Sequence, residues 1–401
     1  MASHLPLPNS IIDTDLYKLT MQQAVLHHFP NSESCYKFTL RDKVPFTQKA
    51  FEIFQQTLGH FVKLALTESE HEWLKKTCPY FTTEYLTYLR NYRFKPSEQV
   101  RAKFVPSSAG SDVGLIEIEI HGPWVETIFW EVPLMATLSE IYFKYVVTDW
   151  SYDGQSALAY EKGRALLQAD CVFSEFGTRR RRSFKTQDIV MESLVRASKD
   201  VKSNGKLSGT SNVHLAHKHN LVPIGTIAHE WFMGVAAVKG YENANAVAMD
   251  LWEQVYPNAI LIALTDTFTT EAFFQSYTRD KERAMRWHGL RQDSGDPFIF
   301  GPRAKEAFES LGIAADQKTI IYSDALNIEK ALRLQEQARD LGLKVSFGIG
   351  TFFTNDFKKA SDAGSSKALN MVIKLSSVDQ RPTTGDQNTV QMVKQIYHLD
   401  S

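Results

Sequence analysis

Short apolar runs, most of them separated by helical patterns, follow one another through the second half of the chain. The runs are Cys171–Ser174, Leu221–Gly225, Ala259–Leu264, Gly289–Arg291, Thr319–Tyr322 and Lys344–Phe347. Parallel strands need a long crossover, usually a helix, so this alternation predicts parallel βαβ units. Five or more such units favour a barrel or a doubly wound sheet.

Polar side chains cluster directly after these apolar runs. They lie in the segments Glu175–Arg182, Gly225–Glu230, Thr265–Thr267, Gln292–Asp296, Ser323–Asn327 and Gly348–Thr351. The active site of a parallel α/β barrel lies at the C-terminal ends of its strands. Polar residues at so many strand ends therefore favour a barrel with an active site over a barrel that serves only as a packed core.

The first third of the chain has a mixed character. Isoleucines alternate with glutamates in Ile116–Ile120, so an antiparallel or edge strand with one solvated face is expected there. Asp13 or Thr14 is expected to cap a helix that runs to Phe29. The expected domains are an N-terminal α+β domain (1–125), an α/β barrel (126–375) and a C-terminal segment (376–401) that packs on the N-terminal domain.

The composition excludes several classes of protein. Lys plus Arg is 45 and Asp plus Glu is 46, and the resulting net charge of −1 argues against a general nucleic-acid binder. The three cysteines form no CxxC pair, so neither a disulfide scaffold nor a cysteine-built zinc site is expected. Neither a signal peptide nor a membrane-spanning run is visible, so we expect an intracellular protein with no membrane partner.

Three loops have both a plain and a functional interpretation. Gly348–Thr351 can cradle a phosphate, because glycines let backbone N–H groups approach it, but the segment also fits a tight turn. Asp293–Asp296 fits a loop with helix caps, or a site for ribose hydroxyls or magnesium diphosphate. Ser323 and Asp324 fit a cap for a helix that begins near Leu326, or a ligand contact.

Charged residues and histidines suggest further sites. A run of arginines usually forms a solvated face, but Arg179–Arg182 follows a buried strand, and guanidinium groups match phosphates and carboxylates. Arg179 is favoured as the residue nearest the strand end. His229 lies at another strand end, which favours a role in proton transfer or as a nucleophile.

A second group of histidines resembles a metal-ligand cluster. His214 and His217 share one face of a helix, whereas His219 is displaced from that face. A solvated basic helix is therefore favoured over a metal site, and no protein-held metal site is predicted.

Together, these motifs resemble the nicotinate phosphoribosyltransferase family, specifically its fungal and proteobacterial-like branch. The matching segments are Thr14–Met21, Glu175–Arg180, Gly209–Asn212, Gly225–Trp231, Asp293–Asp296, Ser323–Asn327 and Phe347–Thr351, in the family's order. The resemblance implies an irregular parallel α/β barrel of the type II phosphoribosyltransferase kind, with an N-terminal α+β domain. One departure is that Val378–Asp386 looks compressed compared with the family's C-terminal part.

The resemblance also implies roles for individual residues. His229 is expected to be phosphorylated by ATP, and Asp293 is expected to take part in catalysis. The residues expected at the nicotinate are Tyr17, Arg179, Thr226 and Arg291. Those expected at the phosphoribosyl group and its phosphates are Ser294, Gly295, Ser323, Asp324, Asn327, Gly348, Gly350 and Thr351.

The implied reaction joins nicotinate to phosphoribosyl diphosphate, giving nicotinate mononucleotide and diphosphate in NAD salvage, with ATP as co-substrate and Mg²⁺ as cofactor. A monomer or homodimer in the cytoplasm, and also in the nucleus, is expected, with no nucleic acid bound. The nearest alternative is a transferase for nicotinamide or quinolinate. More remote alternatives are a metal-dependent hydrolase that uses the three clustered histidines, and a barrel that binds ligands without catalysis.

Overall fold

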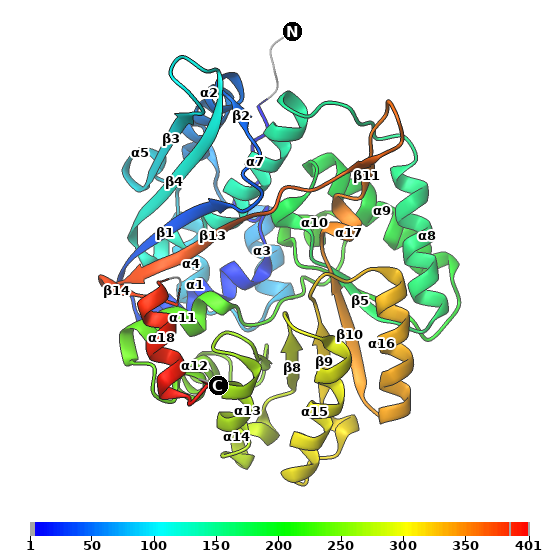
Figure 1. Ribbon diagram of the computed structural model, residues 1–401. Helices are drawn as coiled ribbons and strands as arrows, with labels where there is room; N and C mark the ends of the chain where they lie inside the picture. The colour runs from blue at the N-terminus through cyan, green and yellow to red at the C-terminus, as the bar shows by residue number, and fades with distance from the viewer. Residues whose placement is uncertain (1–4, 385, 400–401) are drawn as a thin grey trace.

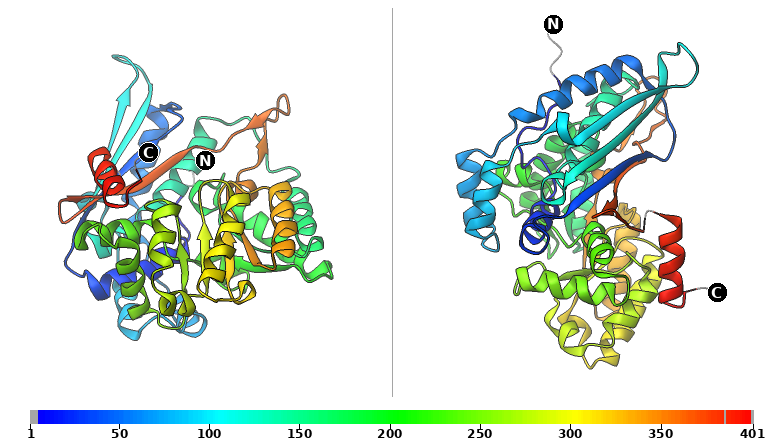
Figure 2. Two further views of the ribbon diagram at one scale, coloured as in Figure 1. Left: turned by 60° about the horizontal axis from the view of Figure 1, so that its bottom comes forward. Right: turned by 90° about the vertical axis from the view of Figure 1, so that its left-hand side faces the viewer.

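The computed structural model describes residues 5–384 and 386–399. Within them the chain builds an antiparallel sheet and a parallel sheet, and the antiparallel sheet lies across one end of the parallel one (Figures 1 and 2). In Figure 1 the arrowheads of strands β8 (Gly289–Gln292) and β9 (Thr319–Tyr322) point toward the antiparallel sheet. The C-terminal strand ends therefore face the N-terminal part of the chain.

The N-terminal part combines helices with antiparallel strands. Its elements are α1 Leu16–His28, β1 Glu33–Leu40, β2 Phe46–Thr47, α2 Gln48–Gly59, η1 Phe61–Lys63, α3 Glu68–Thr77, α4 Thr83–Asn91, α5 Pro96–Gln99, β3 Val100–Pro106, β4 Val113–Pro123, α6 Trp124–Thr127 and α7 Glu131–Tyr145. The expected alternation is confirmed in β4, because Ile116, Ile118 and Ile120 are buried and Glu117 is exposed. This strand pairs antiparallel with β1, β2 and β3.

The predicted cap of the first helix is wrong. α1 begins at Leu16, with Asp15 in the N-cap position, and no side chain caps it. The backbone N–H of Leu16 instead donates to the carbonyl of Ser211, 2.8 Å away. The side chain of Asp13 is directed to a buried arginine, so a tertiary ion pair has replaced the local cap.

The second part alternates helices and parallel strands. Its elements are α8 Gln155–Gln168, β5 Val172–Glu175, η2 Thr178–Arg180, α9 Phe184–Asp200, β6 Lys206–Thr210, α10 Val213–Lys218, α11 His229–Lys239, α12 Ala244–Val255, β7 Ile262–Leu264, α13 Thr270–Tyr277, α14 Lys281–Arg286, β8, α15 Pro297–Ser310, η3 Ala315–Gln317, β9, α16 Ile328–Leu341, β10 Lys344–Ile349 and α17 Thr351–Thr354. The strand order is β6-β5-β10-β9-β8-β7, and all paired strands are parallel.

One predicted strand is wrong and one strand was missed. The run Leu221–Gly225 forms no strand and makes only an isolated bridge between Pro223 and Thr210. Proline has no backbone N–H to donate to a ladder. The missed strand is β6, which lies at one end of the strand order and contains Lys206 and Ser208. An edge strand tolerates polar residues, so it lacks the apolar run that marks the others.

The C-terminal part returns to the antiparallel sheet. It comprises β11 Phe357–Lys358, β12 Ser365–Ser366, β13 Met371–Val378, β14 Arg381–Pro382 and α18 Gln387–Ile396. β11 and β12 pair only with each other in the described residues, and β13 and β14 join the antiparallel sheet. β13 pairs antiparallel with residues 34–40 of β1 and is linked to β14 by Asp379 and Gln380, which both have positive φ. Tyr397 contacts Tyr241 and Ala244, so the end of the described chain lies on the barrel. β13 crosses the predicted boundary at residue 375, and both boundaries remain predictions.

Among the described residues, no helix combines the length and the apolar character needed to cross a membrane.

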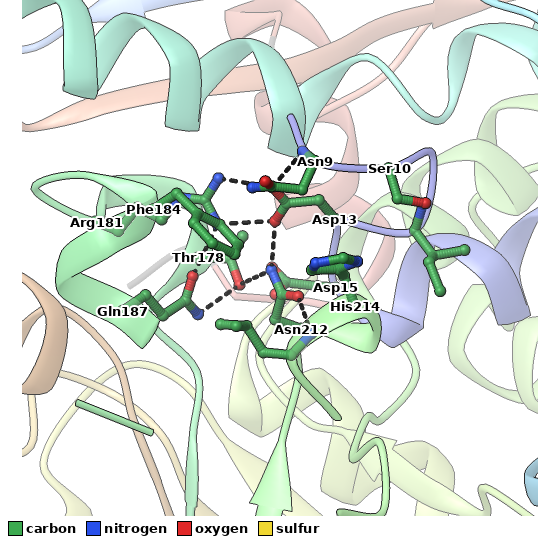
Figure 3. Close-up of polar contacts among 12 residues, drawn as sticks. Asn9, Ser10, Asp13, Asp15, Thr178, Arg181, Phe184, Gln187, Asn212 and His214 are labelled. Carbon is green, nitrogen blue, oxygen red and sulfur yellow. Dashed lines mark hydrogen bonds and ion pairs between the residues drawn. The ribbon is translucent and has the colours of Figure 1, made fainter. Parts of the chain in front are cut away.

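A buried ion pair attaches the N-terminal segment to the barrel (Figure 3). Arg181 donates from Nη1 and Nη2 to the two carboxylate oxygens of Asp13, at 2.8 and 3.0 Å. Asn212 donates to the same carboxylate at 2.8 Å, and the Asn9 backbone N–H donates at 3.1 Å. Burial opposes ionisation of Asp13, but the Arg181 charge holds its pKa well below the usual range. The pair therefore positions the loop that carries the arginine run.

Replacing Asp13 should destabilise the fold strongly. Asp13→Asn leaves the Arg181 charge buried without a counterion, so we expect a loss of about 3–5 kcal/mol in the free energy of unfolding at pH 7. Urea denaturation measures this loss. Glu68→Gln is the control, because its pair with Arg90 is exposed and should contribute less than about 1 kcal/mol. Equal small losses in the two variants would contradict the assignment.

Candidate active site

His229 lies open to solvent at the strand ends. It is the first residue of α11, and its side chain is 39% exposed. Its Nδ1 atom lies 3.1 Å from the hydroxyl of Thr267, and its Nε2 atom lies 3.3 Å from Asp293 Oδ2. Asp266 Oδ1 is 3.7 Å from the same Nε2 atom. The helix N-terminus favours an anion at this position, and the partners orient the ring, so the imidazole can accept a phosphoryl group or a proton.

Arg291 connects several of the predicted residues. Its Nε atom donates to Ser323 Oγ at 2.8 Å, Nη1 to Thr226 Oγ1 at 2.9 Å and Nη2 to Asp293 Oδ1 at 2.9 Å. Ser323 also donates to Asp293. Burial opposes ionisation of Asp293, but the Arg291 and His229 contacts hold its pKa well below the usual range. Asp293 is therefore a carboxylate at neutral pH.

Three aspartates that follow β7, β8 and β9 offer oxygen ligands for a cation. Asp266 Oδ1 is buried and makes no hydrogen bond, while Ser294 donates to its other oxygen. Burial, followed by the charges of Asp293 and Asp266, raises the pKa of Asp324. Mg²⁺ is typically held by one or two carboxylates together with substrate phosphates, which suits this donor set. Within the described residues, the one close group of potential metal ligands lies elsewhere, on α3, and involves Glu68, His71 and Glu72.

Tyr17 and Arg179 meet at one carboxylate. The hydroxyl of Tyr17 lies 3.3 Å from Glu131 Oε2, and Arg179 Nη1 lies 3.1 Å from Glu131 Oε1. Lys18 Nζ lies 2.6 Å from Glu131 Oε2. The neighbouring Tyr17, Glu131 and Asp15 hold the pKa of Arg179 above the ordinary value, although burial opposes this. Lys18 and Glu131 were not predicted from the sequence, although Lys18 lies within the Thr14–Met21 motif.

The four arginines in the run have different surroundings. Arg179 is 42% exposed, whereas Arg181 and Arg182 are buried. Arg182 donates to Ser366, and its guanidinium carbon lies 3.6 Å from the centre of the Phe143 ring. Arg180 donates from Nε to the carbonyl of Met371 at 3.1 Å. The run is therefore not a solvated face, and Arg179 is the member that reaches the Tyr17 site.

The glycine loop is shaped by an aromatic ring. A Cβ atom at Gly348 would lie 2.4 Å from the ring of Phe176, and one at Gly350 would lie 3.2 Å from the Phe176 carbonyl oxygen. Phe176, which was not predicted from the sequence, is half-buried, with its ring centre 6.0 Å from the Arg291 guanidinium carbon. The close packing requires glycine at 348 with or without a phosphate, and Thr351 begins α17 directly afterwards.

Three further predicted residues serve local structure. Asn327 caps α16 by accepting the Lys330 N–H. The interpretation of Ser323 and Asp324 as the cap is therefore wrong, and the helix begins at Ile328, two residues after Leu326. Gly295 has φ +80° and, with Ser294, offers its carbonyl to Gln292. Asp296 caps α15. The loop reading of Asp293–Asp296 is thus confirmed for Asp296, and the ligand roles of all these residues remain predictions.

Comparison with known proteins decides the family. Residues 12–139 match the N-terminal domain of the nicotinate phosphoribosyltransferase (NAPRTase) family, and residues 171–396 match the NAPRTase family itself. The chain belongs to the nicotinate phosphoribosyltransferase family. It is 41% identical to a "Probable nicotinate phosphoribosyltransferase" from Schizosaccharomyces pombe over 97% of both chains. It is also 41% identical to the Methanosarcina acetivorans nicotinate phosphoribosyltransferase, over 93% of this chain and 91% of that one.

Solved structures of the family share this fold. A putative nicotinate phosphoribosyltransferase from Saccharomyces cerevisiae superposes with a TM-score of 0.95 at 37% identity, covering 99% of this chain and 100% of that one. The Porphyromonas gingivalis nicotinate phosphoribosyltransferase gives 0.87 at 32% identity, covering 97% and 99%. The predicted α/β class, with an irregular parallel barrel and an N-terminal α+β domain, is confirmed, and the chain is an enzyme.

The clustered histidines of this NAPRTase-family chain have separate partners. His214 lies 3.5 Å from Glu70, and His219 lies 2.8 Å from Asp188. The ring of His217 packs on Trp73, with ring centres 5.0 Å apart. Three histidines that contact three different groups do not converge on one ion. This arrangement removes the basis for a metal-dependent hydrolase.

Glu175 is a buried carboxyl group below the Arg179 loop. It accepts hydrogen bonds from Gln187 Nε2 at 2.9 Å, from Thr210 Oγ1 at 2.6 Å and from the backbone N–H of Gly177. Burial, with a further contribution from the Asp15 charge, raises the pKa of Glu175 to about 7 despite these hydrogen bonds. The folded protein therefore retains a proton that the unfolded chain releases at lower pH.

This retained proton predicts a pH dependence of stability. Because the unfolded glutamate releases its proton near pH 4.3, unfolding should become easier as pH rises from about 4.3 to about 7. Glu175→Gln should make that fall in the free energy of unfolding shallower by roughly 1 kcal/mol per pH unit. Denaturant titrations at pH 5, 6 and 7 test this, with Glu192→Gln on the exposed face of α9 as the control. Parallel pH profiles for the wild type and Glu175→Gln would refute the assignment.

Proposed function

We propose that the chain transfers the phosphoribosyl group of phosphoribosyl diphosphate to nicotinate, forming nicotinate mononucleotide and diphosphate, with ATP hydrolysis coupled to the transfer. The observation that carries this proposal is the constellation at the strand ends. An open histidine, His229, lies beside the Arg291–Asp293 group. Tyr17 and Arg179 meet at Glu131, which Lys18 links to Glu230, the residue after His229. Membership of the nicotinate phosphoribosyltransferase family supports the choice of substrates.

The transfer itself needs positioning and electrostatics more than a protein nucleophile. The pyridine nitrogen forms a bond to the anomeric carbon, while the bond from that carbon to the diphosphate oxygen breaks. Positive charge develops on the sugar and negative charge on the leaving group, and fixed dipoles and charges stabilise both. We assign Gly348, Gly350 and Thr351 to the 5′-phosphate, since glycines admit close backbone approach. We assign Ser323 and Asp293 to the ribose side.

Selection of the acid over the amide is assigned to Arg179. Arg291 has partners for Nε, Nη1 and Nη2, whereas Arg179 forms an ion pair only with Glu131 among the described residues. The remaining N–H groups of Arg179 suit a carboxylate in bidentate geometry. Nicotinamide would leave that charge unpaired, so the amide is discriminated against. Quinolinate carries a second carboxylate, and the proposal assigns no further arginine to bind it.

Magnesium and ATP complete the proposal. Bound Mg²⁺ would supply charge neutralisation for the diphosphate, and Asp266, Asp293 and Asp324 are the residues that would hold it. With ATP, an unprotonated imidazole nitrogen of His229 forms a bond to the terminal phosphorus, the bridging P–O bond breaks and ADP leaves. Water later cleaves the P–N bond and releases phosphate. The phosphate on His229 changes the affinity of the site for anionic substrates. ATP hydrolysis drives the transfer through this change in affinity.

The cytoplasmic or nuclear location and the oligomeric state remain predictions.

The decisive assay follows pyridine nucleotide formation with and without ATP. Wild type, His229→Ala and His219→Ala are each given phosphoribosyl diphosphate with nicotinate, nicotinamide or quinolinate. We expect product from nicotinate with wild type, an increase in that product when ATP is added, and an acid-labile phosphate on the protein. His229→Ala should lose the ATP response and the protein phosphate, because the phosphoryl acceptor is absent. His219→Ala, whose histidine is bound to Asp188, should keep both.

Two results would overturn parts of this assignment. An ATP response retained by His229→Ala would remove His229 from its role. If the wild type forms more product from nicotinamide or quinolinate than from nicotinate, that pyridine and not nicotinate is the substrate.

A further inference from the structure

Glu131 receives three donors from two parts of the chain. Tyr17 and Lys18 come from α1 and share its Oε2 atom, at 3.3 and 2.6 Å, while Arg179 comes from the barrel loop and occupies Oε1 at 3.1 Å. The glutamate is the first residue of α7, and its side chain is 10% exposed. One carboxylate thus contacts both of the residues assigned above to the pyridine.

Lys18 balances the charge of Glu131 and connects it to the histidine helix. Its side chain is fully buried, and Nζ lies 2.5 Å from Glu230 Oε2 as well as close to Glu131. Glu230 follows His229 directly, and its other oxygen accepts hydrogen bonds from Tyr36 and Trp124. Both oxygens of Glu131 and both oxygens of Glu230 receive hydrogen bonds or ion pairs, so the two carboxylates are held in fixed positions. Although burial opposes it, the Lys18 and Arg179 charges keep the pKa of Glu131 below its ordinary value.

A role in stabilising the fold does not explain why this network extends to Arg179, which is partly exposed to solvent. Arg179 is 42% exposed, and a long exposed side chain loses conformational freedom only when something holds it. Glu131 fixes one nitrogen of the guanidinium group and leaves the others for a ligand. It also holds the hydroxyl of Tyr17, which sets the direction of the ring that is assigned to the pyridine. Preorganised groups bind a ligand more tightly because the ordering cost is already met.

We propose that Glu131 is a positioning residue for the pyridine substrate: it holds the Arg179 guanidinium and the Tyr17 ring as one unit and thereby determines the affinity for nicotinate. This inference rests on the proposed function, which assigns Arg179 and Tyr17 to nicotinate.

Glu131→Asp tests position without changing charge. The shorter side chain keeps the negative charge beside Lys18 but cannot reach both Arg179 and Tyr17 as before. We expect KM for nicotinate to rise about tenfold, as the loss of a hydrogen bond to a charged group implies, whereas kcat and KM for phosphoribosyl diphosphate change less than about twofold. Steady-state kinetics with each substrate varied in turn measure this split. A general loss of structure would instead change both KM values or kcat.

Tyr36→Phe is the matched control. It removes a hydrogen bond from the opposite end of the same buried network, at Glu230, and does not touch Glu131. We expect lower stability in thermal unfolding with KM for nicotinate unchanged. An equal rise in KM for nicotinate in Tyr36→Phe and Glu131→Asp would mean that the network acts only through stability, and would overturn the proposal.

Two more variants keep the test decisive. Tyr17→Phe retains the ring but removes the hydroxyl that reaches Glu131, so KM for nicotinate should rise about threefold or more even if Glu131→Asp does not fold. An unchanged value would contradict the role of Glu131 toward Tyr17. Arg179→Ala distinguishes the assignment of Arg179 to nicotinate from the positioning role of Glu131. If it leaves KM for nicotinate unchanged, the assignment of Arg179 under the proposed function fails. If it raises that KM while Glu131→Asp does not, only the positioning role of Glu131 fails.

Discussion

A single buried lysine holds together the parts of the chain that form the candidate site. Lys18 lies between Glu131 on α7 and Glu230 on α11, with its side chain fully shielded from water. Charges out of water are costly unless each is paired with good geometry, so the three groups can be buried only together. The helix that carries Tyr17, the helix that begins at His229 and the loop that carries Arg179 are therefore fixed relative to one another. The position of α1 against the barrel is what makes one site out of residues far apart in the sequence.

The near-neutral charge of the chain is compatible with the three anionic substrates proposed above. The positive groups near the site are held by carboxylates, with Arg181 on Asp13, Arg291 on Asp293 and Arg179 on Glu131. These pairs differ in exposure, and Arg179 is the most open of the three arginines. A local arrangement of this kind suits small anions better than a polyanion, because the field is focused in one place while the surface as a whole stays balanced.

The sequence predicted the repetitive part of the fold well, since each apolar run is a local signal. The runs at β5, β7, β8, β9 and β10 became strands, and residues that follow β7, β8 and β9 lie together around Asp293 and His229. The run Leu221–Gly225 failed because Pro223 interrupts a strand, and β6 was missed because an edge strand needs no apolar run. Asp13 was expected to cap a helix, but its carboxylate pairs with Arg181, which lies 168 positions away. Glu131 and Lys18 were missed for the same reason, since nothing near either residue in the sequence reveals the partner.

The most direct test of the account is a crystal structure of the protein with nicotinate and phosphoribosyl diphosphate bound. We expect the pyridine ring to lie against Tyr17, its carboxylate to bind Arg179, and the 5′-phosphate to bind at Gly348–Thr351. The side chains of Lys18, Glu131 and Glu230 should keep the contacts described above. Nicotinate bound away from Tyr17 and Arg179, or a bound state in which Lys18 has left both glutamates, would contradict it.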